Sequence, residues 1–83
     1  MKELEQKIIE AANSIPKTYG EYRLINPLYT AIARIMEYRV DIISGRAIIH
    51  NNDEHEKVRK IIAGMEKMGI LIKSKSGMAY KMK

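Results

Sequence analysis

Two histidines with two carboxylates between them are the residues whose types come nearest to a metal site. His50 and His55 bracket residues 51–54, Asn-Asn-Asp-Glu, and imidazoles and carboxylates are common metal ligands. A spacing of five positions spans a helix cap, however, and does not place both imidazoles on one helical face. A loop histidine more often belongs to polar surface. We therefore expect no metal site.

Other catalytic arrangements do not emerge from the sequence either. No pair of nucleophile and base, no glycine-rich phosphate loop and no pair of buried carboxylates can be picked out. The chain has no cysteine, which excludes disulfides and thiolate metal sites and is compatible with a reducing compartment. We expect a protein that is not an enzyme and that has no small-molecule cofactor.

The uneven distribution of charge is the strongest chemical feature of the chain. Residues 1–56 carry seven Lys or Arg and nine Asp or Glu, a net charge of −2. Residues 57–83 carry eight Lys or Arg and one acid, Glu66, a net charge of +7. Such asymmetry indicates an anionic partner for the C-terminal part. The alternative is that the lysines keep an exposed hairpin soluble and protect its edge, and charge alone supports both interpretations equally.

The length of 83 residues predicts a single domain over 1–83. A domain of this size buries only about 60% of its unfolded surface, so its core is marginal without further support. Apolar residues remain beyond the expected three-helix core at Leu4, Ile8 and Ile15 and in the segment 40–49. We expect one of these two stretches to pair two chains in a homodimer.

The apolar residues are not arranged for a membrane. No apolar run approaches the ~18 residues that span a bilayer, and the start MKELEQK carries acids and lacks a secretory apolar stretch. We expect a cytoplasmic protein, in the host cytoplasm if the source is viral. The composition, with 14 isoleucines and abundant Lys and Glu, is typical of thermophiles and of AT-rich genomes.

Two helices and a short strand are expected in the N-terminal half. A helix over 2–14 presents Leu4, Ile8 and the alanines 11–12 on one face. A short strand over 22–25 follows, and a second helix begins at residue 27, with Asn26 as its cap and Pro27 in its first turn. Its end stays open. It stops near residue 38, so that 40–50 is a hairpin turning at residues 44–45, or it continues to residue 43 with a glycine cap at 45.

A third helix over 52–68 and a hairpin over 70–83 complete the expected order. Capping residues 51–53 open the helix and Gly69 ends it. A three-residue hairpin loop with Gly77 in the left-handed position sets the expected register. It pairs 74 with 78, 72 with 80 and 70 with 82 on the inner side, with Leu71 under the third helix. Four side chains are expected to point outward: Lys73, Lys75, Lys81 and Lys83.

This order of elements resembles the winged helix-turn-helix superfamily of DNA-binding proteins. The stretch VRKIIAGMEKMGILIK, residues 58–73, resembles its recognition helix running into the first wing strand. The stretch KSGMAYKM, residues 75–82, resembles the wing tip and the return strand. About the last 32 residues match well and 22–37 match loosely. One departure is the segment of about 14 residues, 38–51, where the family has a turn of a few residues.

The resemblance implies an α+β fold, a three-helix winged helix-turn-helix with a C-terminal β-hairpin wing. It implies a double-stranded DNA partner and transcription regulation, as in the small winged-helix regulators of archaea and their viruses. In this family the third helix enters the major groove and the wing contacts backbone or minor groove. The resemblance places the following residues at the DNA: Lys57, Arg59, Lys60, Ala63, Gly64 and Lys67 on the third helix, Lys73, Lys75, Ser76 and Lys81 on the wing, and Tyr29, Thr30 and Arg34 on the second helix.

Three acids near the start of the third helix limit what this surface can recognise. Asp53, Glu54 and Glu56 repel phosphate at the end that normally probes bases, so we expect few base contacts and mainly backbone binding. Two alternatives remain. The layout is also similar to a ribosomal winged-helix protein, which implies RNA binding. A winged-helix protein-interaction module would need an apolar outer face on the third helix, which the Glu-Lys-Ala-Lys face does not offer.

Overall fold

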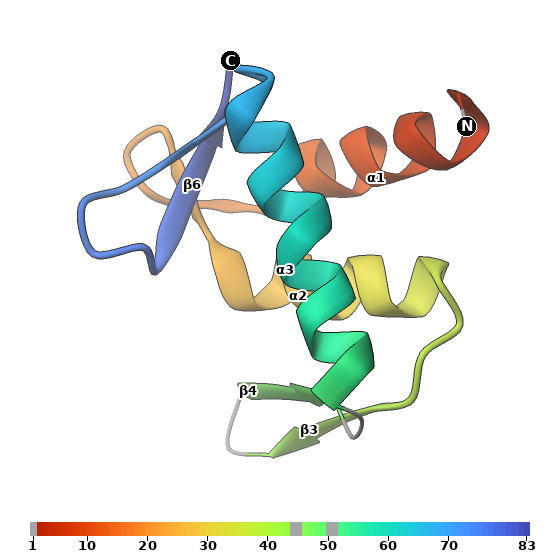
Figure 1. Ribbon diagram of the computed structural model, residues 1–83. Coiled ribbons are helices and arrows are strands. Elements are labelled where there is room, and N and C mark those ends of the chain that lie inside the picture. The colour runs from red at the N-terminus through yellow and green to blue at the C-terminus, as the bar shows by residue number, and fades with distance from the viewer. Residues whose placement is uncertain (1, 44–45, 50–51) are drawn as a thin grey trace.

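Three helices and a small antiparallel sheet make up the part of the chain that the computed structural model describes, residues 2–43, 46–49 and 52–83 (Figure 1). The fold class is α+β. The elements follow one another as α1 (Lys2–Ser14), β1 (Lys17–Tyr19), β2 (Tyr22–Leu24), α2 (Ile25–Ile35), β3 (Val40–Ile43), β4 (Arg46–Ile49), α3 (Asn52–Lys67), β5 (Leu71–Lys73) and β6 (Ala79–Met82).

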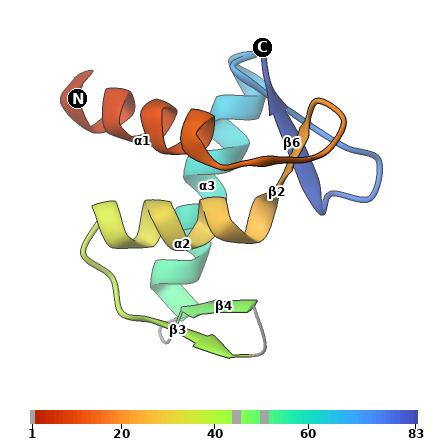
Figure 2. The same cartoon turned by 180° about the vertical axis from the view of Figure 1, so that it is seen from behind.

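The strands form one four-stranded sheet and one separate hairpin. The sheet has the order β1-β2-β6-β5 and is antiparallel throughout. The helices lie on one side of it, and the β3–β4 hairpin lies near the start of α3 and packs against α2 (Figures 1 and 2). The sequence-based order therefore lacked β1, and it contained β3 and β4 only as one of two alternatives for the segment after α2.

The core lies between the three helices and the inner face of the sheet. Each large aliphatic side chain that is fully buried there stabilises the fold by roughly 1.5–3 kcal/mol. The buried apolar residues are Ile8, Ala12, Ile25, Leu28, Ile32, Ala33, Val58, Ile62, Met65, Leu71, Ala79 and Tyr80. These positions recur at helical spacing in α1, α2 and α3, which explains why periodicity located all three helices.

The C-terminal end of α1 depends on a side chain from the far end of the chain. In a continuous helix the carbonyl of Ala12 would accept from the N–H of residue 16, but residue 16 is proline and has none. The hydroxyl of Tyr80 donates to the Ala12 carbonyl instead, at 2.7 Å, in a buried position. The missing helical donor is thus replaced from β6.

A second side chain satisfies the neighbouring carbonyls at this helix end. The guanidinium of Arg23, on β2, donates from Nε to the Ile15 carbonyl at 2.7 Å and from Nη2 to the Asn13 carbonyl at 3.4 Å. The last turn of α1 has no basic residue of its own, and a cation favours the negative end of the helix dipole. The sheet therefore closes the helix that packs on it.

The start of α2 differs from expectation by two residues. The helix begins at Ile25 rather than at 27, with Leu24 as N-cap, and the preceding strand ends at Leu24. Asn26 is therefore not the cap. The N–H of Ile25 donates to the Met78 carbonyl at 3.0 Å, which satisfies a free donor of the helix start. Pro27 still lies in the first turn, where its lack of an N–H costs nothing.

The end of α2 decides between the two alternatives for the following segment. The helix ends at Ile35, and Glu37 has a left-handed φ of 62°. The N–H of Glu37 and that of Tyr38 donate back to the carbonyls of Arg34 and Ala33, so the chain leaves the helix in a tight closing motif. The hairpin interpretation is correct and the longer helix is wrong. The expected turn at residues 44–45 lies outside the described residues.

The helix α3 begins at Asn52, as expected, and ends one residue earlier than expected. Gly69 has φ 77°, and the N–H of Ile70 donates to the Met65 carbonyl at 3.0 Å. This left-handed closure turns the chain directly into β5. Of the three expected capping positions, 51 lies outside the described residues, whereas Asn52 and Asp53 lie within the first turn.

The register of the C-terminal hairpin is one residue away from the expected one. Leu71 pairs with Met82, and residues 72 and 73 pair with Lys81 and Tyr80. Six residues, 74–79, therefore lie between the last paired residues, Lys73 and Tyr80, rather than the three expected. Gly77 does have the expected left-handed φ, 76°, and Leu71 is buried as expected.

This shift changes which side chains face the core. Cross-strand partners lie on the same face of a sheet, so Lys73 shares the inner face with Tyr80, and Ile72 shares the outer face with Lys81. Ile72 and Met78 were expected inside and are 40% and 64% exposed. The hydrogen bond between Tyr80 and α1 anchors β6, and Leu71 fills the core opposite it, so this register is the one that buries both.

Candidate nucleic-acid interface

The outer surface of α3 carries exposed residues of both charges. Lys57, Arg59, Lys60, Ala63 and Lys67 are all exposed. The helix holds four acids and four bases, so its net charge is zero. Lys60 lies 3.9 Å from Glu56, one helical turn away. Exposed pairs of this kind are weak, so both side chains remain open to other partners.

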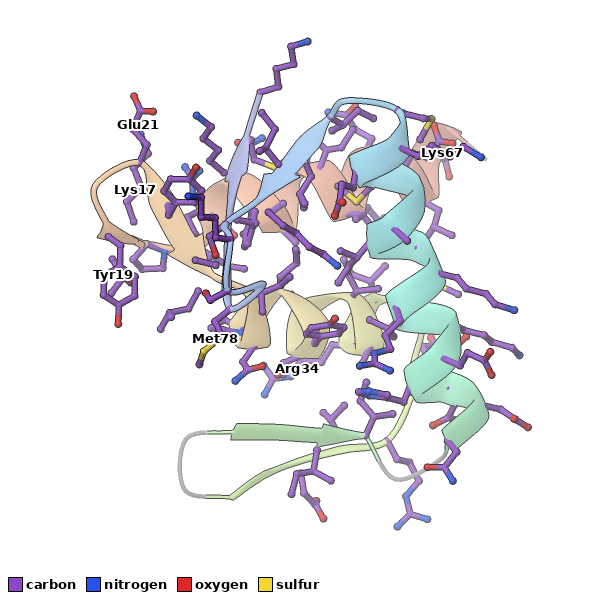
Figure 3. The ribbon with its side chains drawn as sticks, turned by 60° about the vertical axis from the view of Figure 1, so that its left-hand side comes forward. Lys17, Tyr19, Glu21, Arg34, Lys67 and Met78 are labelled. Atoms are coloured by element: carbon purple, nitrogen blue, oxygen red, sulfur yellow. The ribbon has the colours of Figure 1, made fainter. Side chains whose placement is uncertain are left out.

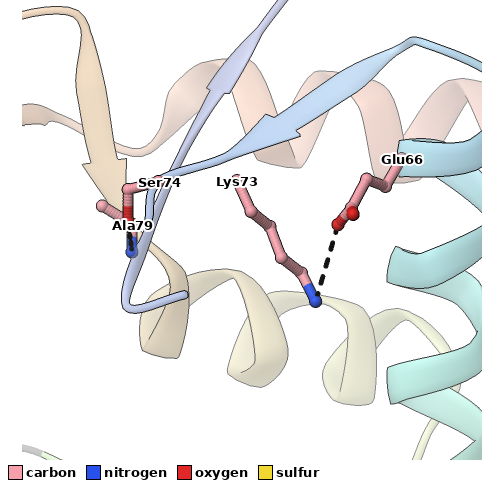
Figure 4. A network of polar contacts seen from close by, with 4 residues as sticks. All are labelled: Glu66, Lys73, Ser74 and Ala79. Carbon is pink, nitrogen blue, oxygen red and sulfur yellow. Dashed lines mark hydrogen bonds and ion pairs between the residues drawn. The ribbon is translucent and has the colours of Figure 1, made fainter. Parts of the chain in front are cut away.

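One ion pair identifies the side of α3 that faces the C-terminal hairpin. Lys73 on β5 places its Nζ 3.7 Å from Oε2 of Glu66 on α3 (Figure 4). Arg59, Ala63 and Lys67 are spaced by four residues and so share the flank of α3 on which Glu66 lies. We call these three residues, which lie on the flank of α3 next to the hairpin, the hairpin-side face.

Lys73 itself does not have its expected role as an outward wing lysine. Its side chain is 33% exposed and lies on the inner face of the hairpin. Its ammonium joins β5 to α3 through Glu66 (Figure 4). The expected outward position of Lys73 is wrong because the one-residue change in register moves residue 73 from the outer to the inner face.

The tip of the hairpin is cationic and open. Lys75 and Ser76 are exposed in the loop. The Ser76 hydroxyl accepts from the N–H of Met78 at 3.3 Å and contacts the Ser74 hydroxyl at 3.2 Å, which orders the loop. Residues 70–83 contain four lysines and no acid, so the hairpin attracts anions along its whole length.

Lys81 lies on the outer face of the sheet rather than at the tip. Its Nζ is 5.5 Å from the ring centroid of Tyr22, a cation–π contact. It pairs across the strands with Ile72. Lys81 is therefore separated by the sheet from the hairpin-side face of α3.

The three expected contacts on α2 have different environments. Tyr29 stacks on His55 of α3, with ring centroids 5.9 Å apart and planes at 17°. Thr30 is 9% exposed, and its hydroxyl donates to the Asn26 carbonyl at 3.3 Å. A buried side chain of this kind cannot reach DNA, so the expectation that Thr30 contacts DNA is wrong. Arg34 is exposed and projects from α2 (Figure 3).

His55 is one of the two histidines considered above as metal ligands. No group of three or more potential ligands from His, Asp and Glu occurs among residues 2–43, 46–49 and 52–83. His50 lies outside these ranges. The ring of His55 packs between α2 and α3 instead, where it adds to the contact of the two helices.

Gly64 belongs to a different surface, a groove between α1 and α3. The groove has a volume of about 270 Å³. It is lined by Leu4, Glu5, Ile8, Ile9, Lys60, Ile61, Gly64, Met65, Met68 and Ile70. Met68 is 65% exposed, so this apolar surface is open to solvent. We call it the α1–α3 groove, and Gly64 and Lys60 belong to its lining.

Two tyrosines next to the β1–β2 turn were not recognised as surface groups from the sequence. Tyr19 and Tyr22 are cross-strand partners, and Tyr19 is 64% exposed. The signal in the sequence is the pair Gly20-Glu21 between them, a two-residue hairpin turn, with φ 62° at Gly20. Recognising this turn would have predicted β1 and the position of both rings.

Comparison with known proteins adds no identification. No protein-family model, curated protein or solved structure matches the chain. Within the described part of the chain, no helix combines the length and the apolar character that crossing a bilayer requires. The function proposed below therefore rests on the charges, contacts and exposed groups of the described residues.

Proposed function

We propose that the chain is a winged-helix protein that binds double-stranded DNA, as a small transcription regulator does. The observation that carries this proposal is a hairpin with four lysines and no acid that directly follows α3 and is tied to it through Lys73 and Glu66. The pairing of β2 with β6 supports it as well, because it holds the hairpin beside the helix in the manner of a wing.

The two parts of this surface contribute differently to binding. The hairpin supplies phosphate contacts through Lys75 at its tip and Lys83 at its end, both exposed. The helix α3 has no net charge, so it adds little to the general attraction of DNA. Its exposed Arg59, Ala63 and Lys67 are the groups available to base edges. Affinity therefore comes mainly from the backbone of the DNA, and sequence preference is modest.

A salt titration tests this proposal. If the four cations named for this surface, Arg59, Lys67, Lys75 and Lys83, each neutralise one phosphate, log K falls against log salt with a slope of about −3.6. Lys75→Ala should reduce the magnitude of the slope by about 0.9 on every duplex tested. Lys7→Ala removes the same charge from an exposed position on α1 and serves as the control. Equal effects of the two variants would show that only net charge matters and that the hairpin is no wing.

The α1–α3 groove is the surface on which we propose that two copies of this chain associate. Both expected pairing surfaces pack partly against the chain's own core, Ile8 from the first and Val40 and Ile49 from the second. The groove is preferred because Leu4 lines it and Met68 in its wall is 65% exposed. The groove has an acid, Glu5, and a base, Lys60, among its apolar lining. A two-fold interface brings a surface against itself, so Glu5 of one copy meets Lys60 of the other.

Charge exchange tests this association by sedimentation. Glu5→Lys or Lys60→Glu alone should shift the equilibrium to monomer, because like charges then meet in the interface. The double variant should restore the dimer. A wild-type chain that stays monomeric at high micromolar concentration, in low and in moderate salt, would exclude the groove as a dimer interface.

A further inference from the structure

The outer face of the four-stranded sheet is open in the part of the chain that the structure describes. The helices lie on its inner side, where Leu71 and Tyr80 are buried (Figures 1 and 2). Alternation along each strand turns the next residues outward. The groups on this outer face are therefore available to a partner, and the hairpin loop beside them is the part shared with the duplex contacts proposed above.

One row of side chains crosses all four strands on this face. Tyr19 of β1 is the partner of Tyr22 of β2, and Ile72 of β5 is the partner of Lys81 of β6. The ammonium of Lys81 lies 5.5 Å from the ring centroid of Tyr22, which links the two pairs. The row thus reads Tyr19, Tyr22, Lys81, Ile72. Its two ends are open, with Tyr19 64% and Ile72 40% exposed.

A hollow of about 280 Å³ lies beside this row. It is lined by Tyr19, Tyr22, Leu24, Ser74, Ser76, Met78 and Ala79. Two aromatic rings and apolar side chains supply a surface for a flat ring, and two hydroxyls supply groups that both donate and accept hydrogen bonds. The volume is at the small end of ligand sites, which suits one planar group rather than a large molecule.

The charges around the hollow are mainly positive. Lys81 lies within the row, and Lys75 lies in the loop that contributes Ser74 and Ser76 to the lining. The nearby acid is Glu21, in the β1–β2 turn. Tyr19 and Met78 project downward in Figure 3, whereas Glu21 projects upward, away from them.

We propose that this face binds unpaired nucleotides, with a base stacked on Tyr19 and Tyr22 and the phosphates near the lysines. Aromatic rings beside basic side chains are the usual combination for binding single strands. Bases within a duplex are already stacked on one another, so only unpaired bases reach these rings. The site is therefore specific for single strands, in contrast to the duplex surface on α3 and the hairpin tip.

The position of Lys81 favours a nucleic acid over a protein partner. A protein that covered the row would bury this ammonium in the middle of an apolar contact, and a charge buried without a counter-charge is costly. A phosphate supplies that counter-charge. Among the described residues, the ammonium contacts the Tyr22 ring, a contact that a stacked base can replace while Lys81 turns to the phosphate.

Fluorescence anisotropy with labelled oligothymidine and oligouridine of roughly eight nucleotides, within the usual site size, tests this inference. Tyr19→Ala should weaken binding roughly 5- to 150-fold, the loss of one stacked base. Tyr19→Phe should bind like the wild type, because stacking needs the ring and not the hydroxyl. Ile48→Ala, an exposed apolar position on the separate β3–β4 hairpin, should have no effect. The two oligonucleotides distinguish DNA from RNA strands.

The same variants separate this site from the duplex surface. Tyr19→Ala should leave duplex affinity and its salt slope unchanged, and Lys75→Ala should weaken both ligands. If Tyr19→Ala binds oligothymidine and oligouridine with wild-type affinity, the site does not exist, whatever the duplex result. If Tyr19→Ala instead changes the sedimenting mass with no change in oligonucleotide binding, the face is a protein interface and the inference is wrong.

Discussion

Replacement of Tyr80 by Phe removes one atom and leaves one buried carbonyl without its donor. The ring is fully buried and its packing is retained in the variant. The carbonyl of Ala12 then has no hydrogen-bond donor from Tyr80, and Pro16 cannot supply one. Leaving a buried acceptor unsatisfied costs about 1–3 kcal/mol. For a domain of this size the melting temperature should fall by between roughly 4 and 24 °C.

Urea unfolding followed by circular dichroism measures this cost, and a double-mutant cycle isolates its cause. In Pro16→Ala, residue 16 regains an N–H that can bond to the Ala12 carbonyl by extending α1. Tyr80→Phe should therefore cost less in the Pro16→Ala background than in the wild type, with a coupling of about 0.5–3 kcal/mol. Equal costs in both backgrounds would refute the reasoning that the tyrosine substitutes for the donor that proline lacks.

Burial raises the pKa of Tyr80 from 10 to about 12, against the lowering effect of Arg23. Because the folded state holds this proton more tightly than the unfolded state, its contribution to the free energy of unfolding is fully present below pH 10. About 2–3 kcal/mol should be lost as the pH rises from 10 to 12. Urea unfolding across this pH range should show the loss in the wild type and not in Tyr80→Phe. Glu37→Gly should raise the free energy of unfolding by roughly 0.5–1 kcal/mol, because Glu37 has a left-handed φ of 62° at the C-terminal end of α2, where glycine is favoured and an acid is not. The control Glu21→Gly adds a glycine without relieving a left-handed φ and should not stabilise the fold. Equal effects of the two variants would disprove this reason. Gly69→Ala should destabilise the fold by about 1 kcal/mol, because residue 69 has a φ of 77°. Gly64→Ala should stabilise it by about as much, because residue 64 lies in the interior of α3 and a Cβ there meets open space among the described residues. Melting curves in which Gly64→Ala unfolds at a lower temperature than Gly69→Ala would contradict both predictions.

Local patterns were sufficient for the helices α1 and α3. Their apolar residues recur at helical spacing, and Pro16 and Gly69 end or close them through backbone geometry that the residue type alone determines. The exposed lysines of α3 followed from the same periodicity. What depends on the residue and its near neighbours was therefore predictable.

The hairpin register was not predictable in this way. Residues 70–72, Ile-Leu-Ile, allow either parity of alternation, and the loop residues fit either length. The contact that selects the observed register joins Tyr80 to Ala12, 68 positions apart. The assignment of Lys73 to the outer face failed for the same reason.

The region after α2 was undecided because its break has no signal in the sequence. Glu37 takes a left-handed φ that usually belongs to glycine or asparagine. The β3–β4 hairpin that follows packs against α2, and the expected surface position of Thr30 was wrong since its side chain is buried. Tertiary contacts decided both points.

The hydrogen bond between Tyr80 and Ala12 has a consequence for the way in which the chain is made. During synthesis α1 is translated first, but the donor that completes its end follows 68 residues later. The nascent helix therefore cannot reach its final stability until the last strand has been translated and has closed the sheet. Because this closure joins distant segments, it makes folding slower than three helices alone would suggest. Nascent chains stalled before residue 80 should leave the end of α1 frayed and accessible to proteases.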